Sequence, residues 1–361
     1  MESLTTTSYT RSKKWTLGLI MLTVVIISWV LSSFLINDIF EKDKYRKPFF
    51  ITYLNTSIFI FYLIPMVKSF IKKAIQEGSC KISDFEEIFM EYNNESTKND
   101  EEISLTSEEE EGNPNSKLSL YETIKLSGQF CIMWYLANLT TNASLSYTSV
   151  GSQTILSSTS SFFTLLVGYL AKTETFNRVK VMGLVLSFVG VVLITKIDSD
   201  VNSEFKKTAL SIFIGNSFAL VGALMYGVYT TLLKFKVKDD SRLNMKVFFG
   251  FVGVFNLIFL WPSLIIFNYT GVEKFQLPSS LDVILIIFVN CLITFVSDFC
   301  WVKAMLLTSP LTVTVGLSTT IPLAMLGDFL FKGEQLSLMY CIAAALICVS
   351  FFIINKDEGE N

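Results

Sequence analysis

The chain has 361 residues, of which 51% are hydrophobic and 17% charged, with a net charge of −3 and a mean hydropathy of +0.50. It contains no histidine, which excludes Ser/His and Cys/His nucleophile pairs, HExxH metal sites and histidine proton relays. Its six cysteines form no C-x-x-C motif, and we interpret the five that lie in long apolar stretches as small buried hydrophobes. We therefore expect a membrane protein that is not an enzyme and has neither a cofactor nor a metal.

Apolar stretches long enough to cross the roughly 30 Å hydrocarbon layer recur along the chain. Because lipid offers no hydrogen-bond partner to the backbone, each stretch should be a helix. The fold class predicted is thus an all-α polytopic membrane protein. We predict ten spans, at residues 15–36, 48–68, 125–146, 149–171, 179–196, 209–233, 245–267, 283–303, 310–331 and 336–355.

The chain contains an internal repeat. Residues 148–196 match residues 308–356 at a constant offset of 160, with 13 identities in 49 positions. Several identities are polar, so shared hydrophobicity does not explain the match. Upstream the offset becomes 197, because Gly18, Trp29 and Pro65 match Gly215, Tyr226 and Pro262.

The repeat predicts five helices followed by five more, with an insertion in the first half. Five is odd, so the second half enters the membrane from the opposite side, which gives the 5+5 inverted repeat of many secondary transporters. The predicted domains are a cytosolic tail at 1–14, a first repeat at 15–196 that contains an acidic disordered cytosolic loop at 69–124, a second repeat at 209–355 and a cytosolic tail at 356–361.

Lysine and arginine are unevenly distributed between the two sides of this topology. With a cytosolic N-terminus, 20 of the 29 fall on the cytosolic side. The positive-inside rule therefore places both termini in the cytosol.

The inserted loop is strongly acidic. Residues 80–116 contain twelve Asp or Glu and two Lys, a composition that predicts disorder. Ser83 and Ser107 each have a glutamate three residues later, which suits an acidophilic kinase. The alternative is a solvated tether without a specific role.

Polar residues inside predicted spans are the candidates for function. In span 283–303, Asn290, Thr294 and Asp298 are four residues apart and share one helix face with Trp301. The repeat aligns Asp298 with Asn138. The first-half counterpart of this face consists of Trp134, Asn138 and Asn142.

We interpret the two faces as the lining of a central solute cavity. The alternative is that the amides and the carboxylate are hydrogen-bonding links between helices. Lys303 could neutralise an anionic solute, or its ammonium could extend to the lipid headgroups. Asp298 is the first candidate for proton coupling and Asp328 the second.

Spans 149–171 and 310–331 carry polar side chains in corresponding regions, among them Gln153 and Ser157 in the first span and Ser318 and Thr319 in the second. Such side chains usually bond to the preceding turn and allow close packing. Their recurrence in both halves predicts helices that slide or bend during gating. Glu174 and Glu334 follow these spans, and we predict that each favours the N-terminus of the next helix.

The residues resemble a known family. The L-x-K-x-E turn before the last helix of each half is similar to that of the drug/metabolite transporter superfamily (EamA-like). Two longer segments resemble the fungal branch of solute carrier family 35, subfamily F: WYLANLTTNASLSYTSVGSQTILSSTSSFFTLL (134–166) and GDFLFKGEQLSLMYCIAAALICVSFFIINK (327–356). The resemblance implies alternating access and a vacuolar membrane location, with the Golgi second.

Two functions remain open. The first is a secondary transporter of a small polar metabolite, with the solute, the bilayer and protons as partners and no nucleic acid. The second is a membrane adaptor that recruits a cytosolic partner through its acidic loop. An adaptor does not need a polar cavity, so the polar faces favour the transporter.

Overall fold

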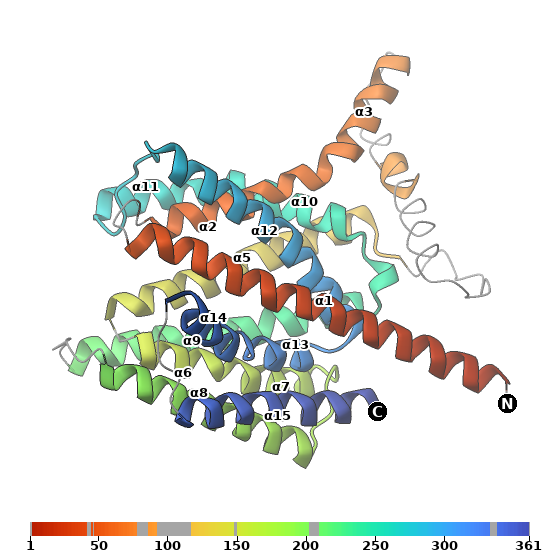
Figure 1. Cartoon of the computed structure of the whole chain (residues 1–361). Coiled ribbons are helices and arrows are strands. Elements are labelled where there is room, and N and C mark those ends of the chain that lie inside the picture. Colours follow the sequence, from red (N-terminus) through yellow and green to blue (C-terminus); the bar gives the residue numbers. More distant parts are fainter. Residues whose placement is uncertain are drawn as a thin grey trace. The chain divides into compact units, whose positions relative to one another are not determined.

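The computed structural model describes residues 2–41, 45, 47–77, 86–91, 117–147, 150–201, 209–332 and 338–360. Every regular element in these residues is a helix (Figure 1). The chain divides into two compact units. Unit 1 comprises Met1–Leu35, Ile132–Lys236 and Cys300–Asn361, and unit 2 comprises Ile36–Cys131 and Val237–Phe299.

Seven helices of the described residues are long and apolar enough to cross a membrane. They are Ser12–Ile36, Pro48–Gln76, Leu210–Val237, Met245–Thr270, Leu281–Leu307, Pro310–Gly327 and Leu338–Asp357, and each overlaps one predicted span. A helical polytopic membrane protein is therefore confirmed.

The other three predicted spans are helical but are not among these seven. Span 125–146 lies in α5 (Leu120–Tyr147) and span 179–196 in α8 (Arg178–Val201). Span 149–171 is divided into α6 (Val150–Ser158) and α7 (Ser160–Leu170). The hydroxyl and amide side chains of α5 lower its hydropathy. The break at Thr159 divides span 149–171 into α6 and α7, and each of these helices is too short to cross a bilayer.

In unit 1, α8 and α15 (Leu338–Glu360) lie side by side along their length (Figure 1). Two glycines of α8 allow this close approach. A Cβ at Gly183 would lie 2.6 Å from Ile354 Cγ1, and one at Gly190 would lie 2.7 Å from Ile347 Cγ1. Small residues are the usual means by which membrane helices pack tightly.

Unit 1 also contains most of α1 (Glu2–Glu41) and α9 (Ala209–Val237), the end of α12 (Leu281–Leu307), and the short helices α13 (Pro310–Leu317) and α14 (Thr320–Lys332). At one end of α8, Leu165 of α7, Leu184 of α8, Leu311 of α13 and Ile354 of α15 form a buried apolar cluster. This cluster joins helices from the middle of the chain to helices from its last fifth.

In unit 2, two membrane helices depart from α geometry. Helix α2 (Pro48–Ser57) continues into α3 (Ile64–Glu77) through the 3₁₀ segment η1 (Ile58–Leu63). Helix α10 (Met245–Phe255) continues into α11 (Trp261–Thr270) through the π-helical segment η4 (Asn256–Leu260). A further 3₁₀ turn, η3 (Asp240–Arg242), precedes α10.

Helix α10 and η1 are in close contact at Gly253. A Cβ there would collide with the backbone nitrogen of Ile60, which cannot move independently of η1. We therefore expect Gly253→Ala to lower the stability of the purified protein by about 2 kcal/mol, as overpacking does. Gly128→Ala is the matched control, because its Cβ would lie 3.3 Å from a Phe255 ring atom that can shift. Thermal unfolding of both variants measures the difference, and equal stabilities would contradict this account.

One segment of the acidic loop lies within the described residues. Residues 86–91 are helical, and Ile88 and Phe89 are buried against Leu63, Met66 and Val247. The predicted disorder is therefore wrong for residues 86–91, because two of the few apolar residues of the loop are buried in an apolar cluster. Lys73 and Glu87 form an ion pair beside it, with 2.6 Å between Nζ and Oε2.

Candidate functional site

The polar face of α12 lies largely in unit 2. Asn290 is 1% exposed, and its Nδ2 donates to Asn55 Oδ1 of α2 at 3.1 Å. The thiol of Cys291 donates to the same oxygen. Asn290 thus links two helices, as the hydrogen-bonding alternative expects. Thr294 and Asp298 follow on the same helix and are half-buried.

The matching face on α5 lies in unit 1. Asn138 is half-buried, and its Nδ2 donates to the Trp134 carbonyl at 2.8 Å. Its amide oxygen remains available for another partner, because an amide carries both donors and an acceptor. Trp134 and Asn142 are also half-buried. Since the Asn138 and Asp298 faces belong to different compact units, their shared cavity stays a prediction.

Trp301 is a packing residue in this conformation. Its side chain is 4% exposed, and its ring lies 6.3 Å from that of Tyr226 and 6.0 Å from that of Tyr229, both on α9. These T-shaped contacts bury the indole between α12 and α9. Lys303 is half-buried on the next turn.

An aromatic cluster, which the sequence analysis did not identify, lies around the α12 turn that carries Asp298. The Tyr62 ring of η1 stacks on Phe295 at 3.8 Å, and its hydroxyl donates to the Phe295 carbonyl at 2.6 Å. Phe299, Phe249 and Phe59 belong to the same cluster. The four-residue spacing of Phe295 and Phe299 indicates from sequence that the two rings share one face of a helix. The position of Tyr62 in the chain does not indicate that it contacts them.

Each of the two predicted gating helices is interrupted, and the two interruptions lie at positions that the repeat aligns. The break between α6 and α7 falls at Thr159, where the amide of Thr159 bonds to the Leu156 carbonyl three residues back. The break between α13 and α14 falls at Ser318 and Thr319, whose amides bond to Val315 and Gly316 in the same manner.

Side chains stabilise both breaks. The hydroxyls of Thr159 and Thr319 each donate to the carbonyl three residues earlier. In α6, Gln153 Nε2 donates to Ser157 Oγ at 2.8 Å. Such local bonds compete with regular helix bonding and favour a bend.

The π-helical segment η4 has a polar anchor. Asn256 is 2% exposed, and its Nδ2 donates to the Tyr53 carbonyl and to Ser57 Oγ of α2. The bonds hold η4 beside the α2 turn that precedes η1. Irregular helix turns of this type are common at functional sites.

The structure corrects the prediction for Glu174. The Glu174 carboxylate bonds to the N-terminus of α13 rather than to that of the following helix, and its Oε1 accepts from the Leu311 amide at 3.1 Å. Its Oε2 lies 3.2 Å from Lys180 Nζ, and both side chains are almost fully buried. The pairing joins positions 137 apart in the chain, which no local pattern reveals.

Several predicted residues lie outside the described part of the structure. Ser83, Ser107 and Glu334 fall in undescribed segments, and Asp328 lies on α14 with its side chain outside the described set. Within the described residues no group of three potential metal ligands occurs.

Unit 2 contains a carboxylate between membrane segments. Glu273 lies in the connection from α11 to α12, and its two oxygens accept the amides of Phe49 and Phe50 at 2.9 Å, in the first turn of α2. Burial raises the pKa of Glu273, while the two amides and Lys47 act in the opposite direction. Burial and the nearby Glu273 also raise the pKa of Tyr45 to about 12.

The raised pKa predicts how Glu273 couples to pH. Folding favours the protonated carboxyl, so its contribution to stability is present at acidic pH and is lost as the pH rises through the pKa in the folded state. We expect Glu273→Gln, which mimics the protonated form, to flatten this part of the pH dependence of Tm between acidic and neutral pH. Asp282→Asn, an exposed carboxylate in the first turn of α12, is the control. A Gln variant with the wild-type pH profile would contradict the assignment.

The sequence matches known transporters over most of its length. The family model for solute carrier family 35 (SLC35F) matches residues 123–356. An uncharacterized vacuolar membrane protein of Saccharomyces cerevisiae is 55% identical, covering 97% of this chain and 92% of its own. A thiamine-repressible mitochondrial transport protein of the same yeast is 41% identical, covering 96% and 92%.

A mammalian relative and a solved structure extend the comparison. Solute carrier family 35 member F5 of Mus musculus is 31% identical, covering 96% of this chain and 78% of its own. A crystal structure with 12% sequence identity superposes with a TM-score of 0.61 and covers 94% of this chain and 97% of its own, which supports the fold alone. The matched model and these identities establish that the chain belongs to solute carrier family 35, in its F branch, a family of membrane transporters of small solutes.

Proposed function

We propose that this protein is a secondary active transporter that moves a small polar metabolite by alternating access. Its ten membrane segments form a 5+5 inverted repeat, with α6 and α7 together making the fourth segment and α13 and α14 the ninth. Both termini lie in the cytosol, and the protein resides in the vacuolar membrane.

The observation that carries the proposal is the pairing of helix irregularities across the repeat. The break at Thr159 and the break at Thr319 are separated by the repeat offset of 160. The 3₁₀ segment η1 and the π segment η4 overlap at the upstream offset of 197. Paired departures from helix geometry support two structurally equivalent halves, and bends in each half support relative movement.

The polar α12 face supplies the proposed solute and proton contacts. Asp298 binds a proton from the acidic lumen and releases it to the cytosol, and Asn138 occupies its counterpart position in the first half. A proton drives exchange only if it favours one conformation over the other. The burial of Asn290 by Asn55 removes that residue from solute contact in this conformation.

Untargeted metabolite analysis of vacuoles from a deletion strain tests the proposal. We expect the vacuolar content of one or a few related polar metabolites to change, and the purified protein in liposomes to transport the same compounds. An unchanged vacuolar metabolite profile, together with a cytosolic protein that co-purifies only when the acidic loop is intact, would instead support the adaptor.

A further inference from the structure

The turn after α7 holds Glu174 in a fixed direction. The amides of Thr173 and Glu174 both donate to the Gly168 carbonyl, and Lys172 has a left-handed φ of 58°. Gly168 leaves room for the glutamate, because a Cβ there would lie 2.5 Å from Glu174 Cγ. The turn is therefore built around the Glu174 side chain.

The Glu174 carboxylate has two partners that belong to different halves of the repeat. Lys180, in the first turn of α8, approaches one oxygen at 3.2 Å and also donates to Thr175 Oγ1 at 3.0 Å. The Leu311 amide, in the first turn of α13, donates to the other oxygen at 3.1 Å. A carboxylate at a helix N-terminus is further stabilised by the helix dipole.

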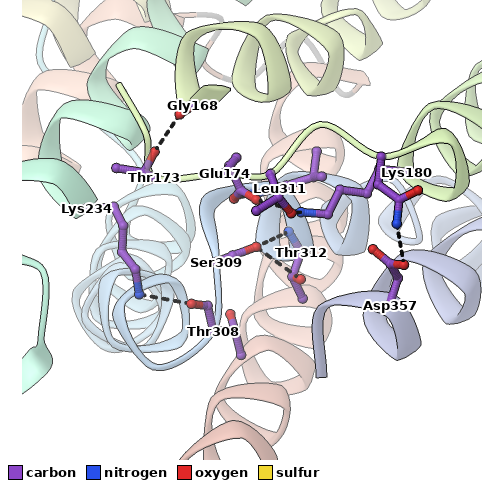
Figure 2. Close-up of polar contacts among 12 residues, drawn as sticks. Gly168, Thr173, Glu174, Lys180, Lys234, Thr308, Ser309, Leu311, Thr312 and Asp357 are labelled. Atoms are coloured by element: carbon purple, nitrogen blue, oxygen red, sulfur yellow. Dashed lines mark hydrogen bonds and ion pairs between the residues drawn. The ribbon is translucent and has the colours of Figure 1, made fainter. Parts of the chain in front are cut away.

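The donor side of this contact, which carries the Leu311 amide, is anchored within the second half. Lys234 of α9 donates to the carbonyls of Leu306 and Thr308, at the C-terminal end of α12. Ser309 then caps α13 by accepting the Thr312 amide at 3.1 Å. Figure 2 shows how these contacts hold the α12–α13 turn facing Glu174.

We infer that Glu174, Lys180 and the Leu311 amide form a latch that closes the Glu174 end of the transporter. The inference rests on the proposed alternating access, in which α7 and α13 of the two halves move apart at one end at a time while α8 and α15 stay packed. Beside the latch, the hydroxyls of Thr164 on α7 and Thr314 on α13 lie 3.5 Å apart, so the two broken helices meet at this end. Separating α7 from α13 requires the Glu174–Leu311 bond to break.

The contact that must open is the hydrogen bond from the Leu311 amide to the Glu174 carboxylate, since Lys180 belongs to the same half as Glu174 and stays paired with it. Once the end opens, water hydrates the freed carboxylate oxygen and the Leu311 amide, so the open state is not penalised by unsatisfied polar groups in a dry interior. By contrast, Asn177 and Asp357 join α8 to α15, two helices that pack along their whole length. The Asn177–Asp357 bond therefore joins the two halves at a place that stays closed when α7 and α13 separate.

Chemical labelling of Thr314→Cys tests the latch. Thr314 is 5% exposed, so a cysteine there should react slowly with a membrane-impermeant thiol reagent in liposomes. In the same background, Glu174→Gln should raise the labelling rate about tenfold, the factor expected when the charged hydrogen bond to the Leu311 amide is replaced by a weaker neutral one. The increase should occur only with reagent added on the side that holds Glu174.

Asp357→Asn is the matched control, because it is also an acid-to-amide change at a bond between the halves, and it should leave the rate unchanged. A folded, monodisperse Glu174→Gln protein with the wild-type labelling rate would overturn the latch. If that variant does not fold, hydrogen exchange of the 308–317 peptide in the wild-type protein decides: exchange slower than that of the α8–α15 interface would overturn the inference, and faster exchange would support it. Faster labelling without transport of any metabolite would reject the proposed function and leave the opening of this contact standing.

Discussion

Asp298→Asn is expected to abolish solute accumulation driven by a proton gradient while leaving the amount of folded protein near that of the wild type. The carboxylate is the titratable group on the polar face of α12, and the amide cannot carry a proton. An amide of nearly the same shape retains the hydrogen-bonding capacity of the half-buried site, so the fold should tolerate it.

Uptake into liposomes with an imposed pH gradient measures this effect, using the metabolite identified from vacuoles. Downhill exchange should persist in the variant, because only the coupling is removed. Asp328→Asn, the second carboxylate candidate, is the comparison and should retain gradient-driven uptake. Accumulation by Asp298→Asn against a solute gradient would show that Asp298 does not couple protons.

Lys180→Met should be the most destabilising change at the Glu174 site, with a loss of about 3 kcal/mol, because it leaves a buried carboxylate without its cation. The double variant Glu174→Gln/Lys180→Met should lose much less than the sum of the two single variants, since the neutral amide can still accept from the Leu311 amide. Both side chains are almost fully buried, so solvent does not screen the loss.

Thermal unfolding of the three variants in one detergent gives the coupling between the two residues. Lys125→Met, an exposed lysine on α5, is the control and should change stability by less than about 0.5 kcal/mol. Additive losses for Glu174→Gln and Lys180→Met would mean that the pair does not act as a unit.

The gating prediction and the Glu174 prediction mark the limits of sequence reasoning at the site. Matching hydroxyl residues in the two halves predicted helices that slide or bend during gating; helix breaks occur at Thr159 and Thr319, where those residues gather, and movement at the breaks stays a prediction. The bending tendency is local, because each hydroxyl bonds to its own preceding turn. The helix N-terminus that Glu174 binds was predicted incorrectly, because its carboxylate accepts the amide of a helix 137 residues away in the chain.

The sequence by itself determined that the chain is helical and membrane-spanning, and that its family is solute carrier family 35. Hydropathy is a sum over neighbouring residues, and lipid leaves the backbone no alternative to helix. Family membership follows from residue identities along the chain. Neither conclusion needs tertiary information. Only the tertiary structure decided that Asn290 bonds to Asn55, that Tyr62 covers Phe295, and that Lys180 and Leu311 share the Glu174 carboxylate. Each of these depends on which helix faces meet, and helix packing is set by many small contacts among residues far apart in the chain.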